Sequence, residues 1–243
     1  DLMNSPNTKN MYQANSFMTM IRKRYKADIT FVLGNHDMIV KGLSIGGRQR
    51  TKVIAYLLGE KIKVIEKDKI ILVKIDSNAG GNLARGMITR RQLDQIDSEL
   101  AGIENLEDYT IVVLLHHHVF KVSKSDFLKI RWREKSIFGS ILDKSKALVD
   151  ANMFATWLQQ RHIKYVLHGH KHVPYFMNKN GTYYISAGSA TGGLKESESH
   201  YYSYNVLRYD YMDKKMKTCL IFYDDNKKAE RKRVEVYLME EDK

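Results

Sequence analysis

The chain has 243 residues, of which 40 are Lys or Arg and 28 are Asp or Glu, so its formal net charge is +12. The length fits one large domain or two small ones, and a hydrophobic content of 43% fits a globular protein with a core of its own. A single cysteine, Cys219, excludes an internal disulfide framework, and the longest aliphatic run, residues 111–115, is too short to cross a bilayer.

In chain order, the apolar spacing predicts a helix over 15–25, a strand over 27–33, a helix over 48–58, two strands within 63–76, a loop over 77–86, a helix over 89–102, a strand over 109–115, a helix over 147–161, and strands over 163–167 and 183–186. Thr89 is a candidate N-cap. The tail then reads as three strands joined by turns, over 205–211, 218–223 and 233–238. This order predicts an α/β sandwich in which one sheet continues as an antiparallel meander.

Three of the predicted strands end in metal-type ligands. These clusters are Gly34-Asn35-His36-Asp37, His116-His117-His118 and His168-Gly169-His170-Lys171-His172. They hold seven of the nine histidines, which an even scatter along the chain would not produce. Because open α/β sheets place their sites at the carboxyl ends of strands, the three clusters are expected to meet at one rim.

Taken together, these motifs resemble the calcineurin-like metallophosphoesterase superfamily, over roughly residues 1–190. Asp76-Ser77, followed by a Gly-containing loop and a helix with Gln92-Leu93, resembles the segment that these enzymes place before the His strand. Residues 186–189 resemble the small-residue strand end that follows Gly-His-x-His. The closest branch is that of bacterial cyclic-nucleotide and glycerophosphodiester phosphodiesterases. The resemblance implies a four-layer αββα sandwich with mixed sheets.

The resemblance also implies a ligand set. Members begin with a strand ending in Asp-x-His and a second ending in Gly-Asp; Asp1 resembles the Asp of the second block, so the first strand is expected to be missing from this chain. Asp1 would then bridge two metal ions. Asn35, His116 and His170 would complete one metal site, and His172 would serve the other. The alternative is a natural variant with one metal ion or none.

The assignment within the His triplet has two versions. In the superfamily the ligand is the first His after the aliphatic strand, which indicates His116. If the alignment slips by one residue, His117 is the ligand instead; otherwise His117 is a neighbour of the site. His118 is expected to be a loop residue or to lie near the substrate. His168 is expected to be structural or to lie just behind the ligands.

The ligand types indicate the chemistry. Neutral imidazoles, a carboxylate and an amide oxygen suit Mn²⁺, Fe²⁺ or Zn²⁺ better than Ca²⁺. By the resemblance, two such ions would hold a phosphoryl group and activate a hydroxide for in-line attack. His36 would act as general acid at the leaving oxygen, with Asp37 as the partner that orients it.

These features predict a metal-dependent phosphoesterase, with phosphodiesters favoured over phosphomonoesters. A phosphorylated small molecule or nucleotide is the expected substrate. The positive charge also suits nucleic acid. The segment 121–144 supplies Lys124, Arg131 and Arg133 as candidate substrate-binding residues, unless it is a charged surface helix. The alternatives are a nuclease of the same chemistry and a non-catalytic binding module that keeps the fold.

Two expectations concern organisation and location. Residues 1–243 are expected to form one domain, with a catalytic core over 1–200 and C-terminal antiparallel strands over 201–243. The single cysteine and the lack of a secretory pattern favour a cytoplasmic protein without a membrane partner.

Overall fold

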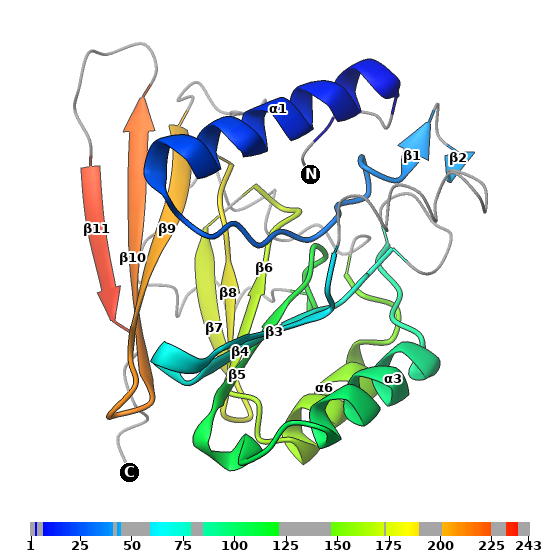
Figure 1. The fold of residues 1–243 in the computed structure, drawn as a ribbon, viewed down its shortest axis with the longest axis vertical. Helices are drawn as coiled ribbons and strands as arrows, with labels where there is room; N and C mark the ends of the chain where they lie inside the picture. Colours follow the sequence, from blue (N-terminus) through cyan, green and yellow to red (C-terminus); the bar gives the residue numbers. More distant parts are fainter. Residues whose placement is uncertain are drawn as a thin grey trace.

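The computed structural model describes residues 3, 7–40, 43–44, 59–78, 85–121, 147–172, 174–189, 201–224 and 232–237. Its main sheet has six strands in the order β3-β4-β5-β6-β8-β7 (Figure 1). The strands are β3 (Ile62–Ile65), β4 (Ile70–Lys74), β5 (Thr110–Leu114), β6 (Tyr165–His168), β7 (Tyr175–Lys179) and β8 (Thr182–Ser186). β4, β5, β6 and β8 are parallel, whereas β3 and β7 pair antiparallel at the two edges. The predicted α/β class with a mixed sheet is therefore confirmed.

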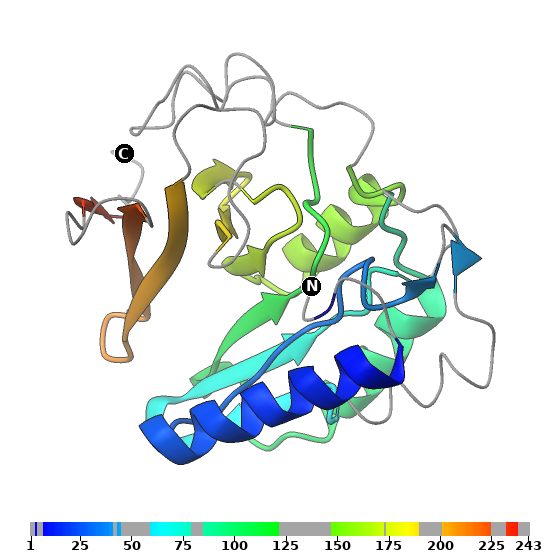
Figure 2. The same ribbon diagram turned by 90° about the horizontal axis from the view of Figure 1, so that it is seen from above.

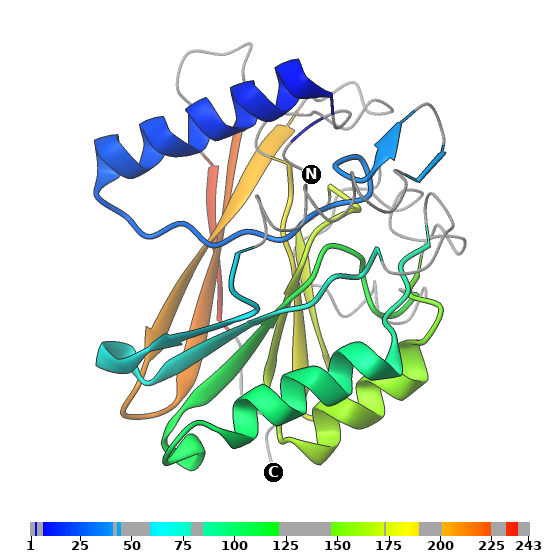
Figure 3. The same ribbon diagram turned by 45° about the vertical axis from the view of Figure 1, so that its right-hand side comes forward.

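Two helices cover one face of the main sheet. They are α3 (Arg90–Ala101) and α6 (Ala151–Gln160), which lie side by side beneath the strands (Figure 3). The predicted cap of α3 is confirmed, because the Thr89 hydroxyl accepts the Gln92 N–H at 3.2 Å. The largest core cluster of the described residues joins this face to the helices, and it includes Val73, Val113, Val166, Leu93, Ile96, Phe154 and Trp157.

A second sheet covers the other face. It is the antiparallel meander β9 (Tyr201–Asp210), β10 (Lys215–Asp224) and β11 (Lys232–Tyr237), as predicted for the tail. Val112, Tyr165 and Ile185 of the main sheet pack with Met216 of this meander. Seen from above, the main sheet lies between the meander and the two helices (Figure 2). Burial on both faces explains why the parallel strands are apolar almost throughout.

The N-terminal segment differs most from the prediction. Helix α1 (Thr8–Tyr25) starts seven residues earlier than expected, at the Asn7 cap, and lies on the side of the chain opposite α3 and α6 (Figures 1 and 3). The predicted strand over 27–33 is wrong, since this stretch has no ladder partner among the described residues. Its apolar side chains Phe31 and Leu33 pack on Met38 and α1 instead.

Two further boundaries depend on contacts that are remote in the sequence. α6 begins at Ala151 rather than at 147, and the residues before it are held by remote contacts: Leu148 and Val149 donate their N–H groups to the carbonyls of His118 and Gly86. Strand β7 was not predicted, although the Asn180-Gly181 turn with φ of 53° and 78° is typical of a two-residue hairpin. The predicted helix over 48–58 lies outside the described residues.

The remaining short elements are strands β1 (Ile39–Val40) and β2 (Leu43–Ser44) and the 3₁₀ turns η1 (Glu66–Asp68) and η2 (Leu106–Asp108). None of the helices in the described ranges is both long enough and apolar enough to cross a membrane.

Asp97 of α3 joins the two helices. Its carboxylate forms an ion pair with Arg161 and accepts the indole N–H of the buried Trp157 at 3.0 Å. We expect Asp97→Ala to lower the free energy of unfolding by about 1–3 kcal/mol, because two donors lose their acceptor. Asp94→Ala, which removes only an exposed pair with Arg90, should cost less than about 0.5 kcal/mol. Urea denaturation of both variants measures the difference, and equal losses would contradict this role.

Candidate metal centre

The His triplet follows β5 directly and is buried. His116, His117 and His118 are exposed by only 4%, 1% and 0% of their surface. The parallel pairing of β5 and β6 continues past both strand ends, since Leu115 donates to the Leu167 carbonyl at 3.1 Å and Gly169 donates to the His116 carbonyl at 3.0 Å. The two histidine loops are therefore held to each other by backbone hydrogen bonds.

The loop after β6 turns sharply at its two histidines. His170 and His172 have φ of 72° and 57°, in the left-handed region that few residues other than glycine occupy. This backbone brings the His170 ring over the triplet, with ring centroids 4.9 Å from His116 and 4.6 Å from His117. His172 is exposed and lies outside this group.

The third cluster forms a closed turn. Asp37 is fully buried, and its carboxylate accepts the N–H of Gly34 at 2.8 Å and that of Met3 at 2.8 Å. These bonds hold Asn35 inward and leave the neighbouring His36 exposed at the rim. The predicted role of Asp37 in orienting His36 stays a prediction; the bonds described here give the carboxylate a structural role in closing the turn.

Three donor atoms from the three clusters converge on one point. His116 Nε2 lies 3.0 Å from Asn35 Oδ1 and 3.0 Å from His170 Nδ1. Two ligand atoms at right angles around an ion, each bonded at about 2.1 Å, are about 3.0 Å apart. Ring nitrogens of His116, His117 and His170 also lie within 4.8 Å of one another. The donor spacing therefore fits a divalent transition-metal ion.

Burial keeps these rings in the form that binds metal. Desolvation, together with the neighbouring His117, His170 and His172, holds the pKa of His116 well below its usual 6.5. Desolvation also lowers the pKa of His117 to about 4. A neutral imidazole offers a lone pair, whereas a protonated one does not. The cluster is thus ready to coordinate at neutral pH without first releasing protons.

Several residues around the centre were not assigned a role from the sequence. Ser77 Oγ lies 2.8 Å from His117 Nδ1, and Asn78 Nδ2 donates to the Leu33 carbonyl at 2.8 Å. Gln92 of α3 holds the Asp76 backbone through bonds of 2.8 and 3.0 Å. The available signal was that Asp76 and Ser77 come after β4, which is parallel to β5 and ends at the same rim.

The other predicted site residues are not all covered by the structure. Asp1, the predicted bridging ligand, lies outside the described residues, as do Lys124, Arg131 and Arg133. His168 is buried with its ring edge-on to Tyr175, as expected of a structural residue.

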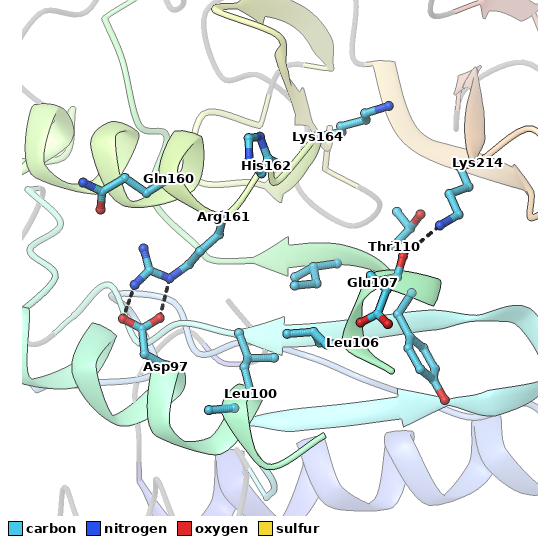
Figure 4. A pocket seen from close by; sticks show the side chains of 13 residues that line it. Asp97, Leu100, Leu106, Glu107, Thr110, Gln160, Arg161, His162, Lys164 and Lys214 are labelled. Carbon is cyan, nitrogen blue, oxygen red and sulfur yellow. Dashed lines mark hydrogen bonds and ion pairs between the residues drawn. The ribbon is translucent and has the colours of Figure 1, made fainter. Parts of the chain in front are cut away.

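A separate cavity of about 780 Å³ lies near the amino end of β5 and the carboxyl ends of α3 and α6 (Figure 4). Some of its polar side chains are used within the fold: Arg161 pairs with Asp97, and Lys214 Nζ donates to the Glu107 carbonyl at 3.0 Å. None of the predicted catalytic or metal-binding residues lines it. The donors suited to chemistry are therefore those at the histidine rim.

His118 should make the protein sensitive to acid. Both its ring nitrogens are buried without a hydrogen-bond partner among the described residues, and desolvation lowers its pKa to about 2. Between pH 6.5 and 4 the unfolded chain takes up a proton here that the folded chain rejects, so stability falls by up to about 1.4 kcal/mol per pH unit for one such group.

We therefore expect His118→Phe to flatten the fall in unfolding free energy between pH 6.5 and 4, measured by urea denaturation of chelator-treated protein. The exposed His162→Asn change serves as control and should leave the slope as it is. An identical slope in His118→Phe and the unchanged protein would contradict the expectation.

Comparisons with known proteins identify the family of the chain. The family model described as calcineurin-like phosphoesterase matches residues 2–174. No curated protein matches the chain. Among solved structures the chain is similar to GAP50, the anchor in the inner membrane complex of Plasmodium, at 12% identity and a TM-score of 0.38, over 70% of this chain and 50% of that one. The chain thus spans about half the length of the GAP50 structure.

Two other structures are similar over most of their own length. Wild-type Vps29 complexed with Zn²⁺ from Entamoeba histolytica has 14% identity and a TM-score of 0.25, over 68% of this chain and 98% of that one. A predicted phosphoesterase from Streptococcus pneumoniae has 11% identity and a TM-score of 0.22, over 68% of this chain and 97% of that one. Because these similarities are distant, family membership rests on the family model. That model covers more than half of the sequence, and the chain belongs to the calcineurin-like phosphoesterase family.

Proposed function

We propose that this chain hydrolyses phosphodiesters with divalent metal ions held at the histidine rim. The main support is the convergence of Asn35, His116 and His170, three donors from separate parts of the chain, on one point. Contacts of 3.0 Å are also hydrogen-bonding distances, so the support lies in the meeting of three metal-type donors from separate parts of the chain at His116 Nε2. A non-catalytic binding module of the same fold is the competing proposal.

The metal ions would supply two things when bound: Lewis-acid stabilisation of the phosphoryl oxygens and a lower pKa for bound water. Asn35, His116 and His170 would hold one ion through an amide oxygen and two imidazole nitrogens. His172 would serve a second ion, together with Asp1. Mn²⁺, Fe²⁺ and Zn²⁺ are the candidates, since all three accept mixed nitrogen and oxygen ligands.

His36 would act on the leaving group. Its side chain is exposed at the rim next to the buried Asn35, where a bound phosphodiester would present its ester oxygen. The imidazolium form would donate a proton to that oxygen as the bond to phosphorus breaks. Asp37, which closes the turn by accepting two backbone N–H groups, would keep His36 in place.

The substrate class follows from charge. A net charge of +12 favours anionic substrates, and we propose a nucleotide or another small phosphodiester. A nucleic-acid substrate would neutralise several basic residues at once, so its KM would rise steeply with salt concentration. A KM that changes little between 50 and 200 mM salt, as expected for a small molecule with few phosphate contacts, would support the small substrate.

The function is tested with bis(p-nitrophenyl) phosphate as a generic phosphodiester. We expect purified protein to retain transition-metal ions through dialysis and to hydrolyse this ester with Mn²⁺ added. Chelation should remove both the metal and the activity, and added Mn²⁺ should restore both. Protein that binds no metal and hydrolyses neither this ester nor p-nitrophenyl phosphate would refute the proposed function.

His36→Ala should separate catalysis from metal binding. We expect kcat to fall by about 10²–10⁴-fold, the usual contribution of a general acid, while the metal content stays unchanged. His116→Ala should instead lose metal and activity together. Metal analysis alongside steady-state kinetics distinguishes the two effects, and unchanged turnover in His36→Ala would remove its assigned role.

A further inference from the structure

We infer that Ser77 and Gly86 position His117 as a third imidazole donor of the metal centre, with Nε2 as its ligand atom. This inference rests on the proposed function, because it concerns the same metal ion. It chooses between the two versions left open by the sequence, in which His117 was either a ligand or a neighbour of the site.

The Ser77 hydroxyl contacts His117 twice. Ser77 Oγ lies 2.8 Å from His117 Nδ1 and accepts the His117 backbone N–H at 3.2 Å. Ser77 has no exposed surface, so water does not compete for these contacts. In the tautomer of His117 that can bind an ion through Nε2, Nδ1 donates its proton to Oγ and the lone pair of the ring lies on Nε2. Metal-binding histidines are commonly fixed in this way by a hydrogen bond to their other nitrogen.

Gly86 leaves no space for the ring to move away. A Cβ atom at Gly86 would lie 2.5 Å from His117 Cγ and 2.8 Å from Nδ1. The glycine is itself held, because its carbonyl accepts the Val149 N–H at 2.9 Å. Met87 beside it donates to the Ser77 carbonyl, also at 2.9 Å. The side of the His117 ring that carries Nδ1 therefore lies against the Ser77 hydroxyl and the Gly86 backbone.

The opposite side of the ring lacks a partner. His117 Nε2 is buried and has no hydrogen-bond partner among the described residues. A buried imidazole nitrogen without a partner is unfavourable unless something else satisfies it. Because Nδ1 is engaged by Ser77, Nε2 is the nitrogen left for an ion shared with His116 and His170.

The same contacts connect His117 to the rest of the centre. Gln92 of α3 holds the Asp76 backbone, which fixes Ser77 as the next residue. Asn78 donates to the Leu33 carbonyl, two residues before Asn35. One short segment, 76–78, thus positions both the His117 ring and the turn that carries the amide ligand.

The test is metal affinity rather than turnover. We expect Ser77→Ala to raise the Kd for Zn²⁺, measured by calorimetry on chelator-treated protein, by about 10–100-fold, as is usual when the hydrogen-bond partner of a metal-binding histidine is lost. Gly86→Ala should raise it as well by displacing the ring, and His117→Ala should raise it at least as much. Circular dichroism confirms that each variant is folded.

Thr182→Val is the matched control. It removes another buried hydroxyl, which donates to the Ile163 carbonyl at 2.9 Å outside the metal centre, and should leave the Kd unchanged. A second readout is the ¹⁵N spectrum of the His117 ring, in which added Zn²⁺ should shift the Nε2 signal of the unchanged protein and should shift it less in Ser77→Ala at the same Zn²⁺ concentration.

The outcomes separate the inference from the proposed function. If the unchanged protein binds Zn²⁺ and hydrolyses the phosphodiester, but Ser77→Ala, Gly86→Ala and His117→Ala keep its Kd, then only the inference fails and His117 is structural. If the unchanged protein binds no metal, the proposed function fails first. A Kd raised in all three variants but not in Thr182→Val supports the inference.

Discussion

The candidate centre depends on the parallel alignment of β5 with β6. Leu114 and Leu167 pair in register, and backbone hydrogen bonds continue beyond them from Leu115 to Leu167 and from Gly169 to His116. A slip of one residue in this pairing would move His116 to the other face of the sheet, because side chains alternate along a strand. The core on both faces fixes the register: Val113 and Val166 pack toward the helices, whereas Val112 and Tyr165 pack toward the meander. The position of the donors is thus set by apolar packing.

The sequence was sufficient where the determining contacts are local or periodic. Helix α3, its Thr89 cap and its apolar stripe could be predicted because each depends on residues within one or two turns. The meeting of the loops that carry His116 and His170 could be predicted because it follows from the parallel pairing of β5 and β6. The strand expected over 27–33 failed for the opposite reason: its apolar residues are compatible with a strand, but a strand exists only with a neighbour to pair with. The role of Ser77 was similarly hidden, because its contact with His117 spans 40 residues of sequence.

The His triplet illustrates a conflict between stability and chemistry. A strand end in the interior would be more stable with apolar residues than with imidazoles whose nitrogens lack partners, as at His117 Nε2 and both nitrogens of His118. The surrounding core offsets this cost, with Val113, Leu115 and Val119 almost completely buried beside the triplet. Proteins usually keep buried polar groups without hydrogen-bond partners only where function requires them. The concentration of unsatisfied nitrogens at the rim therefore points to the same place as the donor geometry, by an independent physical criterion.

Donor geometry and unsatisfied nitrogens also explain why the rim, and not the cavity near the amino end of β5, is the candidate site. In the cavity some of the charged groups already have protein partners, with Arg161 bound to Asp97 and Lys214 bound to a carbonyl, so a ligand would have to displace these bonds to use them. At the rim the buried nitrogens gain a bond when an ion enters, and burial has already removed their water and kept the rings neutral. Binding at the rim thus uses nitrogens that lack a partner among the described residues, such as His117 Nε2, while the contacts of His116 with Asn35 and His170 would be replaced by bonds to the ion. Buried polar atoms that lack a hydrogen-bond partner therefore indicate the site better than the volume of a cavity does.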